Sequence, residues 1–132
     1  MSRSTADGPS TLTLNVVLVR GTLSGPPRSR ELPSGSRVVA YDVTVPRPDG
    51  GRADTVPVSW FDPPEAATEL DAGDEVIVLG RVCRRFFRQA AGTGSRTDVV
   101  ADGVVPVRRK SQARKAVARA EAAVGAGGEA LT

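Results

Sequence analysis

The spacing of hydrophobic and polar residues predicts a chain built mainly from β-strands. Alternation is clearest over residues 37–46, where one face would carry Val39, Tyr41, Val43 and Val45. Further valine-rich runs predict strands over residues 12–25, 54–61, 74–89 and 97–107. Pro57 suggests that the third strand lies at an edge or carries a bulge, and Gly80 indicates a bend or bulge in the fourth.

One short helix is predicted between the third and fourth strands, over residues 64–70. Asp62 can cap its start, Pro63 and Pro64 suit a first turn, and Gly73 can end it. Five strands with one helix at this point predict an all-β, five-stranded Greek-key barrel, the OB fold, over residues 12–107. Residues 1–11 are expected to form a disordered arm, and residues 108–132 a basic tail that is helical or disordered.

The composition fits a small globular domain and excludes several classes of protein. The chain has 132 residues, of which 39% are hydrophobic, enough for one domain with a modest core. Cys83 is the single cysteine, so the chain cannot form an internal disulfide. The sequence has no apolar run long enough to span a bilayer, and its first residues lack the apolar segment of a signal peptide. These features predict a cytoplasmic protein.

The net charge of +3 is distributed unevenly along the chain. Residues 1–107 hold 12 arginines against 13 acids, whereas residues 108–132 hold six basic residues against two acids. The run RVCRRFFRQ, residues 81–89, places Phe86 and Phe87 among four arginines, although the chain has only five aromatic residues. Such a run can contact phosphates and stack on bases. A solvated strand with one phenylalanine in the core would have the same pattern, so the run alone leaves both interpretations open.

Five segments resemble, in order, those of bacterial single-stranded-DNA-binding proteins. Residues 15–35 resemble the opening strand and loop of that family, and residues 38–45 resemble its second strand. Residues 56–82 resemble its third strand, helix, turn and fourth strand. The segment RRFFR, residues 84–88, lies where the family has an aromatic residue after a basic dipeptide. Residues 96–104 resemble the closing strand. The resemblance covers roughly residues 12–107 and implies an OB fold that binds single strands.

The resemblance also implies which residues contact DNA. Trp60 and Phe87 fall on stacking aromatics of the family, which leaves their neighbours Phe61 and Phe86 for the core, although the reverse assignment stays open. The family's third stacking aromatic has no counterpart in residues 45–51. Phosphate contacts are expected first from Arg84, Arg85 and Arg88, and then from Arg37, Arg81 and Arg96. Each arginine could instead form a surface ion pair with the acidic segment, residues 62–75.

Catalysis is not expected from this sequence. The chain has no histidine, and Cys83 has no partner base, which excludes the usual serine–histidine and cysteine–histidine nucleophiles. No spacing of ligand residues indicates a metal site, and no cofactor is expected.

The predicted function is sequence-independent binding of single-stranded DNA in replication, repair or recombination, in the cytoplasm and associated with the nucleoid. A protein-interaction module with weak or no DNA binding is an alternative, and an RNA-binding barrel is also open. A nearly continuous apolar run over residues 14–19 predicts a homo-oligomer, and the resemblance implies a tetramer. The sequence lacks the family's acidic tip, so tip-dependent partner recruitment is not expected. The basic tail is expected to add phosphate contacts instead.

Overall fold

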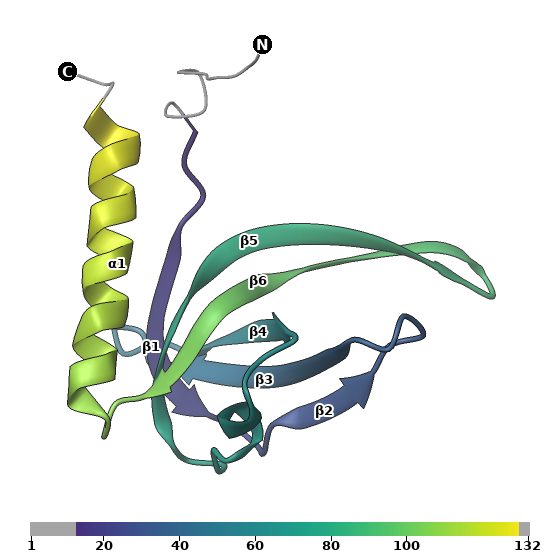
Figure 1. The fold of residues 1–132 in the computed structure, drawn as a ribbon, viewed down its shortest axis with the longest axis horizontal. Coiled ribbons are helices and arrows are strands. Elements are labelled where there is room, and N and C mark those ends of the chain that lie inside the picture. Colours follow the sequence, from purple (N-terminus) through teal and green to yellow (C-terminus); the bar gives the residue numbers. More distant parts are fainter. Residues whose placement is uncertain (1–12, 130–132) are drawn as a thin grey trace.

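The computed structural model describes residues 13–129, which form a β-sheet domain and one α-helix. The strands are β1 (Val17–Leu23), β2 (Arg28–Glu31), β3 (Arg37–Val45), β4 (Asp54–Phe61), β5 (Glu75–Gln89) and β6 (Gly92–Pro106), and the helix is α1 (Lys110–Gly128). The sheet has the order β1-β5-β6-β4-β3-β2, and β1 also pairs with β3 (Figure 1). Within residues 13–129, no helix is long and apolar enough to cross a membrane.

The predicted five-stranded Greek-key barrel with one helix between its third and fourth strands is wrong. The sheet has six strands, because residues 28–31, expected in a loop, form β2 and pair with β3. The α-helix in the described residues is C-terminal, at Lys110–Gly128. The segment between β4 and β5 contains only a 3-10 turn, Glu65–Thr68. Residues 1–11, the expected arm, lie outside the described residues.

Local hydrogen bonding explains why a longer helix does not form after β4. Asp62, the expected cap, has a positive φ of 49°, and its carboxylate accepts a hydrogen bond from the backbone N–H of Arg37 at 3.1 Å. Its own backbone N–H donates to the carbonyl of Arg37 at 2.7 Å. Asp62 therefore closes the β3–β4 ladder and does not start a helix. Pro63 and Pro64 follow, and the 3-10 turn then begins at Glu65 without a capping hydrogen bond from a side chain.

The core lies between the faces of β1, β3, β4, β5 and β6. Its buried members are Leu23, Val39, Tyr41, Val43, Val58, Val76, Val78, Val99, Ala101 and Val104, with Ala67 and Leu70 from the segment after β4. The alternation predicted along residues 37–46 is confirmed at Val39, Tyr41 and Val43, which are fully buried. The predicted irregularity at Gly80 is also confirmed, because the β5–β6 register shifts between Leu79 and Gly80. A Cβ at Gly80 would lie 2.3 Å from the Val100 carbonyl oxygen, so a larger residue does not fit.

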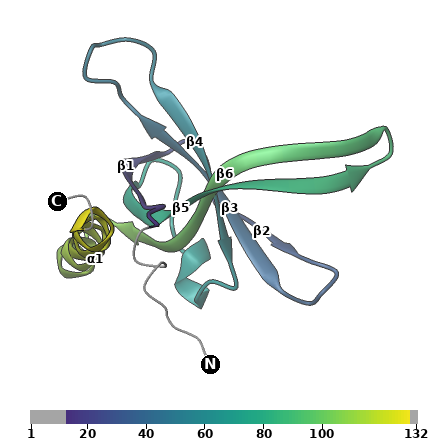
Figure 2. The same ribbon diagram turned by 90° about the horizontal axis from the view of Figure 1, so that it is seen from above.

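Helix α1 covers the opposite face of β5. Ala113 and Ala116 are buried against Ile77, together with the partly buried Val105 and Val107. Because alanine side chains are short, the helix can lie close to the sheet. Figure 2 shows α1 on one side of the sheet, while the β5–β6 and β2–β3 hairpins extend away from it. The basic residues of α1 and the basic run of β5 are thus at different ends of the molecule.

Tyr41 joins the 3-10 turn to the core and provides a direct test of core packing. Its hydroxyl donates a hydrogen bond to the carbonyl of Ala67 at 2.8 Å, and burial raises the pKa of Tyr41 far above its ordinary value. Because its pKa is raised, Tyr41 makes its full contribution to the free energy of unfolding below its ordinary pKa of about 10. This contribution is lost as the pH rises above that value. Since Tyr41 is the only tyrosine, alkaline absorbance titration should show tyrosinate appearing together with unfolding. Ionisation near pH 10 in folded protein would contradict this packing.

Candidate nucleic-acid interface

The β5–β6 hairpin projects from the sheet as a long ribbon. Its ladder runs from Cys83↔Asp98 at the root to Gln89↔Gly92 at the tip. From Phe86 to Thr93 every residue is exposed, so this part of the hairpin has no covering element (Figure 1). Successive side chains point to opposite faces of the ribbon, and the side chains on both faces reach solvent.

A cleft of about 390 Å³ separates this hairpin from β2. It is lined by Arg30 of β2 and by Arg85, Phe86, Phe87 and Arg96 of the hairpin. The side chains of Phe86 and Phe87 are 68% and 47% exposed. The sequence doublet was expected to supply one core residue and one exposed residue, but both rings are in solvent because the hairpin extends beyond the core.

The cations around the two rings are largely free of acidic partners. Arg84 lies with its guanidinium carbon 5.3 Å from the centroid of Phe86 and donates a hydrogen bond to the Ser95 hydroxyl at 3.2 Å. Among the described residues, no ion pair involves Arg30, Arg81, Arg84, Arg88 or Arg96. None of these five arginines is therefore paired with the acidic segment, residues 62–75.

Arg85 is the exception, because it forms a buried ion pair at the root of the hairpin. Its Nη2 donates to Asp98 Oδ2 at 2.6 Å, and Ser59 Oγ donates to the same oxygen at 2.8 Å. The Asp98 side chain is 1% exposed, and the guanidinium carbon of Arg85 lies 5.2 Å from the centroid of Phe61. Asp98 Oδ1 and Arg85 Nε are buried with no hydrogen-bond partner among the described residues. The pair joins the two strands of the hairpin, and its contacts with Ser59 and Phe61 connect the hairpin to β4. Arg85 is therefore less available to a phosphate than its neighbours.

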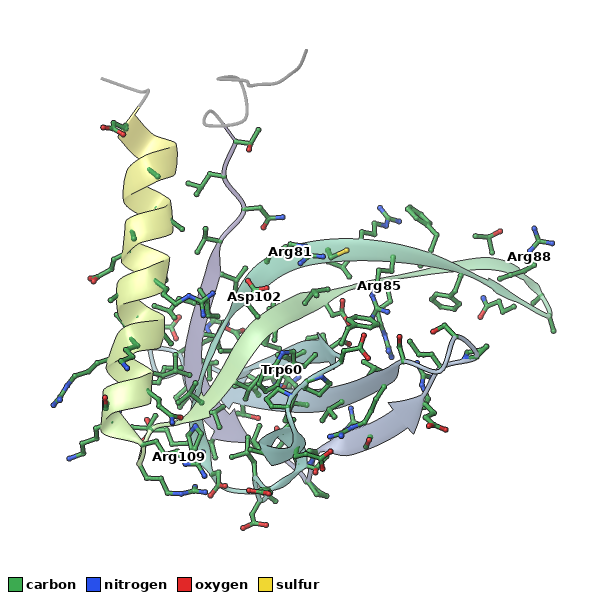
Figure 3. All side chains as sticks on the ribbon, in the orientation of Figure 1. Trp60, Arg81, Arg85, Arg88, Asp102 and Arg109 are labelled. Carbon is green, nitrogen blue, oxygen red and sulfur yellow. The ribbon has the colours of Figure 1, made fainter. Side chains whose placement is uncertain are left out.

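The remaining expected contacts lie outside the cleft. Trp60 is half-buried and packs against the core, where it lines a second cavity beside the 3-10 turn. Arg37 is half-buried at the start of β3, and Arg81 is exposed on β5 opposite Val100. Figure 3 shows Trp60 over the sheet, apart from Arg88 near the hairpin tip. The structure thus brings Phe87 and Arg96 together in the cleft, leaves Arg84 and Arg88 on the same hairpin outside the cleft lining, and separates all four from Trp60.

Sequence reasoning missed Arg30 and treated Phe86 as a core alternative. The signal for Arg30 was the alternation of Arg28, Ser29 and Arg30 immediately before the LPSG turn, which is typical of a short hairpin strand. The signal for Phe86 was the high density of charge on both faces of residues 84–88, which leaves no apolar face for burial. Comparison of the sequence with protein-family models and with curated proteins finds no match to this chain.

Proposed function

We propose that this protein binds single-stranded DNA without reading its base sequence, through the β5–β6 hairpin and the cleft that faces β2. The observation that carries the proposal is the pair of exposed rings, Phe86 and Phe87, among arginines that, apart from Arg85, form no ion pair with a described residue. The sequence resemblance of residues 12–107 to single-stranded-DNA-binding proteins supports the same function. Replication, repair and recombination are the processes in which such binding would be used.

The physical basis is stacking combined with phosphate contact. An aromatic ring contributes about 1–3 kcal/mol per stacked base, whatever the base. The bases of a duplex already stack on one another, so exposed rings favour single strands. No acid interrupts residues 80–97, so the hairpin does not repel phosphates. Binding should weaken as salt rises, with a slope of about 0.7 per phosphate contact.

Replacement of the two phenylalanines is the direct test. Phe86→Ala and Phe87→Ala should each weaken binding of a labelled oligothymidine by about 1–3 kcal/mol, because each removes one stacking surface. Fluorescence anisotropy of the labelled oligonucleotide measures this. Val124→Ala is the matched control, since Val124 is an apolar side chain, 50% exposed, on α1. It should leave binding unchanged.

Two results would refute the proposal. One is parental affinity in the Phe86→Ala, Phe87→Ala double variant. The other is equal affinity for a single strand and a duplex of the same length, which would indicate only attraction between charges. Oligouridine in the same titration compares RNA with DNA.

A homo-oligomer, with a tetramer as the expected form, stays a prediction. Leu14 precedes β1 and is 50% exposed, and Leu18 lies in β1 and is 42% exposed. The apolar run noted in the sequence therefore does leave apolar surface. A second copy of this chain could cover that surface.

A further inference from the structure

One flank of α1 forms a groove where the helix lies against the sheet, here called the α1 groove. Its volume is about 430 Å³, and its apolar floor consists of Ile77 of β5, Val107, and Ala113 and Val117 of α1. Val117 is only partly buried, and Ala118 beside it is exposed. Figure 2 shows no described element beyond α1 on its outer side. The helix therefore leaves an apolar strip on this flank without a cover among residues 13–129.

Two charged side chains of opposite sign lie on either side of this strip. Arg114 and Glu121 both line the α1 groove and are exposed. Neither forms an ion pair with any residue from 13 to 129. No acid lies three or four residues from Arg114, and no base lies three or four residues from Glu121. Since these are the spacings at which side chains of one helix meet, α1 offers neither charge a partner on its own surface.

The two charges are placed symmetrically about the apolar strip. Arg114 precedes Val117 by as many residues as Glu121 follows Ala118. If two α1 helices lie antiparallel about a two-fold axis at the midpoint between Val117 and Ala118, Arg114 of one copy faces Glu121 of the other. Val117 then faces Ala118 of the second copy. The same rotation brings Lys110 opposite the uncharged residue 125, so it opposes no two like charges directly.

We propose that the α1 groove binds the same groove of a second copy of this chain, with Arg114 of each copy paired to Glu121 of the other. A two-fold contact requires a surface that complements itself, and opposite charges at equal distances from an apolar centre meet that requirement. Single-stranded DNA fits the groove less well, because the floor is apolar and Glu121 would repel phosphate. The contact involves α1 and so goes beyond the homo-oligomer predicted from the apolar run of residues 14–19. It does not depend on DNA binding at the hairpin.

Reversal of the two charges, singly and together, tests this contact. Arg114→Glu and Glu121→Arg each place like charges at both symmetry-related contacts, so each should raise the dissociation constant between copies about tenfold. The double variant Arg114→Glu, Glu121→Arg restores opposite charges in exchanged positions and should return to within about threefold of the parent. Sedimentation velocity over a range of micromolar concentrations measures this. Loss of the contact halves the mass, whether the parent is a dimer or a tetramer.

Arg119→Glu is the matched control, because it makes the same charge change at an exposed position of α1 outside the groove lining. Residue 119 lies about 200° around the helix from Val117 and should change the dissociation constant less than about twofold. Circular dichroism checks that each variant keeps its helix. Three results would overturn the proposal: a monomeric parent at the highest concentration, parental mass in both single variants, or a double variant that associates no better than the single variants.

Discussion

Asp98→Ala is expected to lower the free energy of unfolding by about 3–5 kcal/mol, the usual result of removing one partner of a buried ion pair. The carboxylate of Asp98 is almost fully buried and accepts hydrogen bonds from both Arg85 and Ser59. Its loss would leave the Arg85 guanidinium, only 33% exposed, without a counter-charge. Urea denaturation followed by circular dichroism measures the change.

Two further variants separate the cost of an unpaired charge from the value of the pair. Asp42→Ala breaks a more exposed pair with Arg28, at 3.0 Å, and should cost about 1 kcal/mol or less. The double variant Arg85→Met, Asp98→Leu should recover most of the stability lost in Asp98→Ala, because apolar residues of similar volume can replace a buried pair. If the double variant is as unstable as Asp98→Ala, unpaired charge is not the cause of the loss.

Ala116→Glu is expected to lower the free energy of unfolding by about 3 kcal/mol, because it places an unpaired carboxylate in an apolar contact. Ala116 is buried against the sheet, in the cluster with Ile77 and Ala113. The larger, charged side chain would force α1 away from β5 and expose Ile77. Urea denaturation measures the loss, and hydrogen exchange of the α1 amides shows whether the helix separates from the sheet.

Ala122→Glu makes the same substitution on the exposed face of α1 and is the control. It should change stability by no more than about 0.5 kcal/mol. Equal effects of the two substitutions would show that α1 does not depend on its contact with the sheet. In that case residues 110–128 would behave as the independent basic tail that the sequence left open.

The strands were largely predictable because their burial follows a simple alternation. Val39, Tyr41 and Val43 face the core as the pattern of β3 indicates, and Gly80 lies at a register shift as a glycine within a strand suggests. These features depend on neighbours in sequence and on the two-residue period of a strand. The projecting run of arginine and phenylalanine was also visible, since its composition is unusual in so short a segment.

The packing of α1 and the position of Trp60 could not be read from the sequence. The buried stripe of α1 consists of alanines, Ala113, Ala116 and Ala120, whose hydrophobicity is too low to form a clear apolar face in the sequence. The two aromatic doublets look alike, but Trp60 lies over the core and Phe86 lies beyond it. The role of Arg85 depends on Asp98, a partner on the facing strand that no local pattern identifies.

The anchor at Arg85 has a consequence for how the hairpin could recognise a ligand. Phe86 is the next residue along β5, and every side chain from there to Thr93 is exposed. The surface proposed to bind DNA therefore begins directly after the residue that is connected to β4. A surface of this kind pays an ordering entropy each time it binds, so its affinity per contact is lower than that of a rigid site. If the exposed rings can reorient, they would adjust to purines and pyrimidines of different size, and tolerance of sequence would come from incomplete preorganisation.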